Sequence, residues 1–262
     1  MRAIWTGAIG FGLVNIPVRI FSATQSSSLD LDMLDKKSHS RIRYKRVSEE
    51  TDKEVAWGDI VKGFKYNGDY VVLTDEDFEK ASPRKSKTIE IQEFTKKDDI
   101  DPSFYDTPYY LEPAKGGERA YTLLREALKD SGKLAIGTFV MRTKENLCIL
   151  KPSGDMLMLI KIRFSEEIRS YSELNIPGTK DITVKPAELK MAQALIAQLT
   201  PKKFDITKYK DTYNEELMQM IEAKAKGKTV KAPKAKATRT KSIDLMEQLK
   251  ESLQQGRHKK AS

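Results

Sequence analysis

Positively charged side chains at two-residue spacing are the groups in this sequence with the most clearly defined chemistry. The segment 41–47 reads Arg-Ile-Arg-Tyr-Lys-Arg-Val, so that cationic and apolar side chains alternate. Alternation with a period of two predicts a strand that carries Arg41, Arg43 and Lys45 on one face. Such a face can bind a row of phosphates. It can also be neutralised by the carboxylates that follow it in the sequence, namely Glu49, Glu50 and Glu54.

The residue types that usually carry catalysis are few and scattered. The two histidines, His39 and His258, have no partner at a spacing that would support metal binding or proton transfer. The single cysteine, Cys148, lies in an apolar stretch and is typical of a core residue. The Gly-Lys-Thr at 227–229 lacks the earlier glycine of a phosphate-binding loop. We therefore predict neither catalytic residues nor a cofactor.

An acidic run at 98–101 is the remaining place where a metal ion could bind. Its aspartates, Asp98, Asp99 and Asp101, are oxygen ligands of the kind that hold Mg²⁺ in nucleases. Aspartates in such a run more often cap helices or lie in a solvated loop. We expect the second arrangement and predict no metal site.

Apolar and alternating segments predict the strands that would position the cations. They are expected as a pair over 3–24, as single strands at 68–74 and 88–94, and as two or three antiparallel strands over 133–164. Glycines at the start, Gly7, Gly10 and Gly12, favour bulges or bends that close a barrel, and Asn15-Ile16-Pro17 favours a turn or a sheet edge.

Four helices are predicted between and after these strands. Their expected ranges are 75–81, 118–131 with Gly132 as the C-cap, 186–199 with Pro186 at the start, and about 207–226. The last carries an apolar stripe from Tyr209 to Ile221, which can pack either in a dimer or in the core of its own chain. The order of elements predicts an α+β body, mainly β, with a closed or strongly bent sheet.

The charge of the chain is concentrated at its C-terminal end. The formal net charge is +9, of which residues 222–262 contribute +8 through twelve Lys and Arg against four Asp and Glu. A basic segment of this kind indicates an anionic partner such as nucleic acid, although solubility alone would also explain it. The single cysteine excludes an internal disulfide, and no apolar run is long enough to span a membrane. We expect a cytoplasmic protein without a membrane partner.

Three segments are predicted within this C-terminal end. Residues 224–241 contain eight Lys and Arg and no acid, which predicts a disordered basic linker. Residues 242–254 carry apolar side chains at three-to-four spacing and predict a short helix, and 255–262 form a basic tail. A helix of about three turns is marginal alone in water, so we expect it to dock into a groove. Its docking residues are Ile243, Leu245, Met246, Leu249 and Leu253.

Several long and unusual stretches of the sequence occur together in one protein family. They are MRAIWTGAIGFGLVNIPVRIF, RIRYKRV, DIVKGF, YVVLTDEDFEKA, PYYLEP, KGGERAYTLLREAL, ELKMAQ, FDITKYKDTYNEEL and IEAKAKG, in this order over nearly all of 1–227. In them the chain closely resembles the bacterial Ku family. The short DLMEQLKESL near the end is also similar to the C-terminal segment of that family. One departure is visible, because some relatives carry cysteines that could bind zinc and this chain has none in that region.

The resemblance implies a specific architecture. Bacterial Ku proteins are homodimers whose β-barrels and bridging arms form a ring around broken ends of double-stranded DNA. By resemblance, residues 1–223 would be the Ku core, with the bridge at about 35–95 and a helical arm at about 185–223. The ring holds the sugar-phosphate backbone and recruits an ATP-dependent DNA ligase in non-homologous end joining. It is not an enzyme itself, and it acts on the bacterial nucleoid.

The cations and the resemblance together predict a set of DNA contacts. The candidates are Lys36, Lys37, Arg41, Arg43, Lys45, Arg46, Arg84, Lys85, Lys87, Arg142 and Lys144. The groove for the C-terminal helix would belong to the ligase. The basic residues that could touch DNA from the linker are Lys228, Lys231, Lys234, Lys236, Arg239 and Lys241. Two other functions stay open, an architectural nucleoid protein that coats DNA with its basic tail and a metal-dependent nuclease built on the acidic run.

Overall fold

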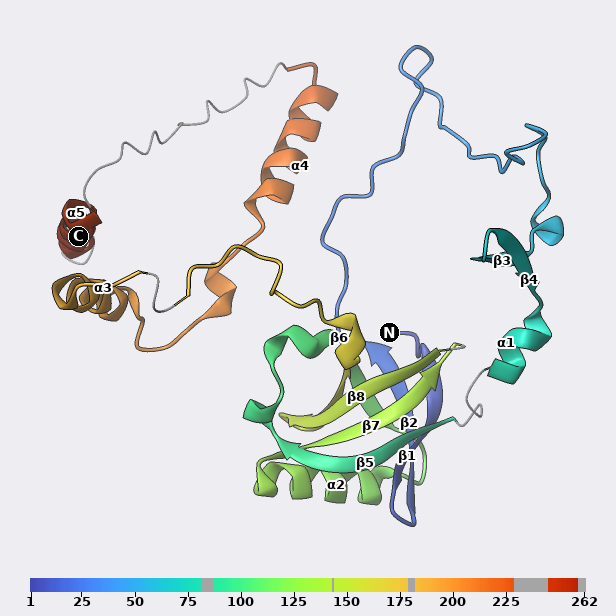
Figure 1. The fold of residues 1–262 in the computed structure, drawn as a ribbon, viewed down its shortest axis with the longest axis horizontal. Coiled ribbons are helices and arrows are strands. Elements are labelled where there is room, and N and C mark those ends of the chain that lie inside the picture. Colours follow the sequence, from blue (N-terminus) through green and yellow to red (C-terminus); the bar gives the residue numbers. More distant parts are fainter. Residues whose placement is uncertain (82–86, 143, 179–181, 229–244, 259–262) are drawn as a thin grey trace. The chain divides into compact units, whose positions relative to one another are not determined.

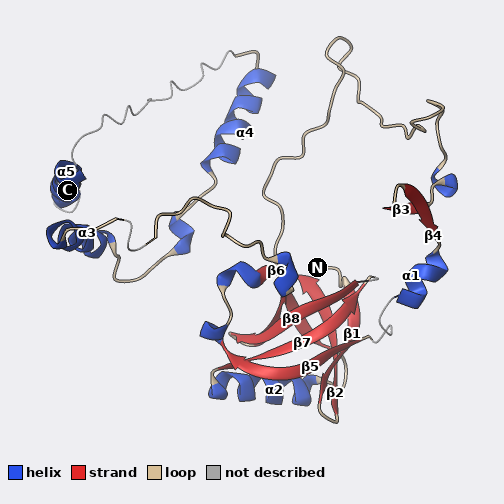
Figure 2. Cartoon of the chain, viewed as in Figure 1, coloured by secondary structure: helices blue, strands red, loops and turns tan. Residues whose placement is uncertain are grey.

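The computed structural model describes residues 1–81, 87–142, 144–178, 182–228 and 245–258 (Figure 1). The chain divides into two units, of which the first contains residues 1–26 and 30–170 and the second contains residues 27–29 and 171–262. Strands dominate the first unit and helices the second (Figure 2). Among the described residues, none of the helices combines the length and the apolar character needed to cross a lipid bilayer.

Seven strands of the first unit close into a barrel (Figure 1). They are β1 (Trp5–Phe11), β2 (Val14–Ser22), β5 (Thr88–Lys96), β6 (Tyr105–Pro113), β7 (Lys133–Met141), β8 (Lys144–Ser153) and β9 (Met156–Ile162). The order around the barrel is β1-β2-β6-β9-β8-β7-β5. Neighbours are antiparallel except β1 and β5, which pair in parallel and close the barrel. The predicted closed sheet is therefore confirmed.

Alternate side chains of the strands fill the inside of the barrel, as the period of two requires. The strand residues of this core are Ile9, Ile16, Val18, Ile20, Ile89, Leu111, Ala135, Phe139, Cys148, Leu150, Leu157 and Leu159. Cys148 has no exposed surface, and this burial raises the pKa of its thiol. Cys148 is therefore a core residue, as predicted.

Helix α2 (Glu118–Ser131) contributes the remaining part of this core and runs beneath the strands in Figure 1. The side chain of Tyr121 links this helix to β6 and β9 through two hydrogen bonds. The Tyr121 hydroxyl donates to the carbonyl of Leu111 at 2.7 Å and accepts from the N–H of Leu157 at 2.6 Å. Gly132, with φ 65°, ends the helix in the left-handed conformation that was predicted for the C-cap.

The acidic run at 98–101 stabilises two short 3₁₀ turns, η2 (Lys97–Asp99) and η3 (Pro102–Phe104). The carboxylate of Asp99 accepts from the Thr95 hydroxyl at 2.7 Å, and that of Asp101 accepts from the Ser103 hydroxyl at 2.6 Å. These side-chain hydrogen bonds are the main reason why the pKa of each carboxyl lies below its ordinary value. Asp99 and Asp101 are thus occupied as caps, which was the expected arrangement.

Between β2 and β5 the chain makes a long excursion, residues 23–87, which we call the arm. Its described elements are η1 (Trp57–Asp59), the hairpin of β3 (Lys62–Tyr66) and β4 (Asp69–Leu73), and α1 (Asp75–Ala81). The predicted strand at 68–74 and helix at 75–81 are therefore confirmed. We call the barrel end where β1 begins and β2 ends the arm-side rim, because the chain leaves the barrel there (Figure 1).

The predicted strand at 41–47 is wrong. This segment is drawn as loop in Figure 2, and its only β pairing consists of two isolated bridges, from Arg41 to Leu34 and from Val47 to Glu54. The apolar side chains that should alternate onto a covered face, Ile42 and Tyr44, are 47% and 80% exposed. A strand needs a neighbour for its backbone groups, and the described part of this chain supplies one only at the two ends of the segment.

The N-terminal hairpin forms as predicted, but its details differ. Strands β1 and β2 pair without a register shift, so the glycines mark no bulge. Asn15 and Pro17 lie inside β2 and pair with Gly10 and Ala8, and the turn falls earlier, at Gly12 with φ 59°. The alternation of apolar residues continues across Pro17, because its missing N–H can be tolerated where the neighbouring strand β6 has not yet begun to pair.

The second unit contains three described α-helices, which are α3 (Pro186–Leu199), α4 (Thr212–Ala225) and α5 (Leu245–His258). The helix predicted at about 207–226 begins later, because a 3₁₀ turn η5 (Ile206–Lys208) precedes it and Asp211 caps α4. No residue of α4 is buried. The alternative that this helix forms part of an intramolecular core is therefore wrong for this structure.

Candidate nucleic-acid interface

A tight turn in the arm presents two of the predicted cations. The carboxylate of Asp35 accepts from the N–H of Lys37 at 3.0 Å and from the N–H and hydroxyl of Ser38 at 2.6 and 2.8 Å. These bonds, led by the one from the Ser38 N–H, lower the pKa of Asp35. The carboxylate therefore stays charged and fixes the turn at neutral pH, and the side chains of Lys36 and Lys37 remain exposed on it.

Three of the other predicted cations have partners within the arm. Arg41 forms an ion pair with Asp32 at 2.6 Å, and Lys45 forms one with Glu54 at 2.7 Å. The guanidinium of Arg46 lies 4.2 Å from the ring centroid of Trp57. Neutralisation by a carboxylate that follows in the sequence was one of the two interpretations, and it holds for Lys45. Arg41 is neutralised too, but by a carboxylate that precedes it. All these side chains are largely exposed, so the pairs contribute little to stability and can exchange for phosphate oxygens.

Of the predicted contacts at 36–46, Lys36, Lys37 and Arg43 are the ones without such partners. Among the described residues, no ion pair or hydrogen bond to another residue involves the side chain of any of the three. Their charge is uncompensated at short range, so an anion that approaches them does not have to displace a carboxylate. These three residues are therefore the strongest candidates for phosphate contacts among the predicted cations at 36–46.

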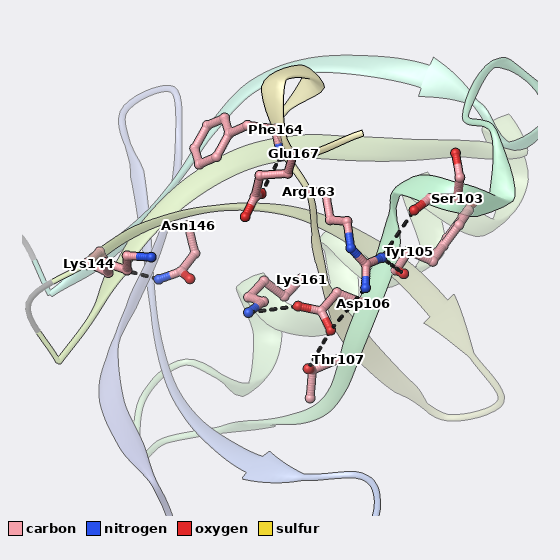
Figure 3. A network of polar contacts seen from close by, with 10 residues as sticks. All are labelled: Ser103, Tyr105, Asp106, Thr107, Lys144, Asn146, Lys161, Arg163, Phe164 and Glu167. Carbon is pink, nitrogen blue, oxygen red and sulfur yellow. Dashed lines mark hydrogen bonds and ion pairs between the residues drawn. The ribbon is translucent and has the colours of Figure 1, made fainter. Parts of the chain in front are cut away.

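A second group of cations lies at the arm-side rim of the barrel (Figure 3). The carboxylate of Asp106 on β6 pairs with Lys161 at 2.7 Å and approaches Arg163 at 3.8 Å. One guanidinium nitrogen of Arg163 also donates to the carbonyls of Ser103 and Tyr105. One carboxylate thus serves two cations, and the group keeps a net positive charge. The hydrogen bond from Lys161 is the main cause that lowers the pKa of Asp106.

Two predicted contacts, Arg142 and Lys144, lie at this same rim. Arg142 occupies the turn after β7 with φ 63°, and Lys144 begins β8 with an exposed side chain. Lys161 and Arg163 were not predicted. They were missed because the apolar run at 156–160 marked their segment as buried strand, although Lys-Ile-Arg-Phe at 161–164 alternates in the same way as the arm segment.

Replacing Asp106 by Asn should destabilise the protein at neutral pH by about 1 kcal/mol, because Lys161 and Arg163 lose their shared carboxylate. The pKa of Asp106 is lower in the folded state than its ordinary value of 3.8. The contribution is therefore present above that value and is lost as the pH falls through the folded pKa. Urea unfolding at neutral pH and at about pH 3 measures it. A difference between the two proteins that is equally large at both pH values would contradict this assignment.

Some predicted residues lie outside the described part of the chain. They are Arg84, Lys85, Ile243, Lys231, Lys234, Lys236, Arg239 and Lys241, together with the side chain of Leu245. Of their neighbours, Lys87 is exposed and its carbonyl accepts from the N–H of Ala8 at 2.8 Å, which fixes the end of the arm to β1. Lys228 is exposed after α4. The described docking residues Met246, Leu249 and Leu253 lie on α5 and are half-buried.

Comparison with known proteins identifies a family that this chain is similar to. Residues 10–191 match the family model described as Ku, the Ku70/Ku80 beta-barrel domain. A relative named non-homologous end joining protein Ku from Coxiella burnetii is 40% identical over 97% of this chain and 94% of its own length. Proteins with the same name from Archaeoglobus fulgidus and Bacillus subtilis are 40% and 37% identical, over 88% and 98% of this chain and over 90% and 83% of their own lengths.

Proposed function

This chain belongs to the Ku family, and from that premise we propose that it binds the ends of double-stranded DNA in non-homologous end joining. The observation that carries the proposal is the similarity over nearly the whole chain to proteins named for this pathway. The exposed cations of the arm and the rim support it, because such groups bind the phosphate backbone of DNA whatever its base sequence. The protein then recognises the backbone and the free end of the duplex, and no reaction is catalysed.

We further propose that the protein acts as a homodimeric ring. The hairpin of β3 and β4 supports an association of this kind. A two-stranded sheet is marginal alone in water. The hairpin also carries large exposed side chains, among them Phe64, Tyr66, Tyr70, Val71 and Val72. A second copy that covers these side chains would remove them from water and stabilise the arm.

The decisive experiment compares three DNA substrates at matched length and salt concentration. They are a linear duplex, the same duplex with both ends blocked by large hairpins, and a covalently closed circle. We expect tight binding to the linear duplex only, because a ring must thread over a free end. Equal affinity for all three would mean that the protein coats DNA from the side, and would replace the proposal by the architectural alternative.

The C-terminal helix α5 is proposed to recruit the ATP-dependent DNA ligase of the pathway. Changing Met246 and Leu249 to Asp should abolish the stimulation of that ligase, since both lie on the apolar face of α5. Binding to linear DNA should stay within about twofold, a change below 1 kcal/mol. Ligation assays and gel shifts measure the two effects. A matched control is the change of Glu251 to Asp on the exposed face, and unchanged stimulation by the double variant would contradict the docking role.

A further inference from the structure

Helix α5 packs against helix α3 of its own chain. The side-chain amide of Gln198 on α3 donates to the carbonyl of Leu253 on α5 at 3.4 Å. The half-buried residues of α5 are Met246, Gln248, Leu249 and Leu253, whereas Glu247, Lys250 and Glu251 are exposed. The contact therefore covers the apolar side of α5 and leaves its charged side in water.

The burial pattern of α3 follows the same contact. Its half-buried residues recur at three-to-four spacing and are Glu188, Met191, Ala192, Leu195 and Gln198. Three other apolar residues of α3 stay in water, with Leu189 52%, Ile196 64% and Leu199 69% exposed. If α5 merely lay near α3 without packing on it, the half-buried residues of α3 would not be confined to one face. The face of α3 that contains Leu195 and Gln198 is therefore a receptor for α5.

We propose that α5 is stored on this face of α3 and that a partner must displace it there before it can bind. The first claim, storage on α3, stands on the contact alone. The second claim, displacement by a partner, rests on the proposed docking role of α5. Met246, Leu249 and Leu253 are the side chains proposed to bind the ligase, and the same three are covered in this structure. One apolar face cannot occupy two grooves at once, so the two associations exclude each other.

This arrangement lowers the apparent affinity for any partner by the fraction of molecules in which α5 is free. It also has a structural consequence for the helix itself. A helix of about four turns is marginal alone in water. Displaced from α3, α5 would lose most of its helical structure until a partner groove takes it up. Contacts on α3 thus set how readily the segment becomes available to a partner.

Hydrogen exchange in the full-length protein tests the storage without any partner. Changing Leu195 to Asp should speed the exchange of the backbone amides of 246–254 at least five-fold, because a carboxylate cannot lie in the apolar contact. Changing the adjacent Ile196 to Asp is the matched control, since Ile196 lies on the exposed side of the same helix. Equal exchange of these amides in the two variants and the unaltered protein would overturn the proposal.

A labelled synthetic peptide of residues 242–258 tests the receptor face directly, with this peptide as the probe. The chain in which Met246 and Leu249 are both Asp should bind the peptide at least five-fold more tightly than the unaltered chain, because its own α5 no longer covers α3. Adding Leu195→Asp should abolish the gain, and adding Ile196→Asp should preserve it. Equal binding by all four proteins would overturn the receptor role, whether or not a single variant is poorly folded.

Ligation assays then separate this inference from the proposed function. Leu195→Asp should raise the stimulation of the ligase at limiting protein concentration, while Ile196→Asp should not. If exchange of α5 accelerates but stimulation stays unchanged, storage stands and the competition with the partner is refuted. If the protein fails to prefer linear DNA, the proposed function falls, although the exchange and peptide results still decide the contact between α3 and α5.

Discussion

Reversing the charge of Lys36, Lys37 and Arg43 to Glu is expected to weaken binding to a linear duplex by about 100-fold at physiological salt. Each lost phosphate contact is assigned about 1 kcal/mol, less than a charge-assisted hydrogen bond between buried groups. Three such losses in one protomer of the proposed dimer amount to about 3 kcal/mol, and each 1.4 kcal/mol is about tenfold in Kd. The glutamates add repulsion and the second protomer loses the same contacts, so the loss of affinity should be at least this large.

The salt dependence of the same variant distinguishes phosphate contacts from a general loss of structure. The slope of log K against log salt should become shallower by about 0.9 for each phosphate contact removed. A matched control reverses Lys115, Arg119 and Lys133, three exposed cations that lie around α2 and away from the arm. Titrations of labelled duplex at several salt concentrations measure both quantities. If the control loses as much affinity as the arm variant, binding depends on net charge and the arm has no special role.

Changing Gly7 to Ala is expected to lower the free energy of unfolding by about 3 kcal/mol, the upper part of the range for an added methyl group in a packed core. A Cβ at position 7 would collide with the backbone carbonyl of Lys87 and with the indole ring of Trp5. That carbonyl accepts from the N–H of Ala8, and the Trp5 indole donates to the carbonyl of Val140 at 2.9 Å. The change therefore disturbs the seam where β1 meets β5.

Gly10 provides the matched control for this prediction, because it lies on the same strand beside the same neighbour. A Cβ at Gly10 would meet the methyl group of Thr88 at 3.1 Å, a side-chain atom that can move. We expect Gly10→Ala to cost less than about 1 kcal/mol. Urea unfolding followed by tryptophan fluorescence compares the two. Equal destabilisation would show that the close approach at Gly7 relaxes easily and that the seam is not tightly packed.

Most strands of the barrel could be predicted from sequence because they are specified locally, whereas β6 was not predicted. Ile16, Val18 and Ile20 alternate, and the turn at Gly12 returns the chain directly to β1, so that neighbours in sequence are neighbours in the sheet. The same rule gave the wrong result at 41–47. Alternation describes a side-chain pattern, whereas a strand also requires a partner for its backbone, and the pattern contains no information about that partner.

The rim cations and the storage of α5 depend on contacts between distant parts of the chain. Asp106 and Lys161 meet because β6 and β9 are adjacent in the barrel, which neither local sequence reveals. In the same way, the apolar stripe of α5 predicts that it docks, but not that α3 receives it. Arg41 and Lys45 were predicted correctly as exposed cations, and their ion pairs with Asp32 and Glu54 follow from a loop geometry that spacing does not define.

The parallel pairing of β1 with β5 places Ala8 beside Thr88 and so closes a loop that contains the whole arm. The entropy lost on closing a loop rises only with the logarithm of its length, so doubling the arm would cost about 0.6 kcal/mol. The stability of the barrel is therefore nearly independent of the length of the arm. Insertions or deletions in the arm can alter its exposed surface while the barrel keeps its fold, and selection can act on the two parts separately.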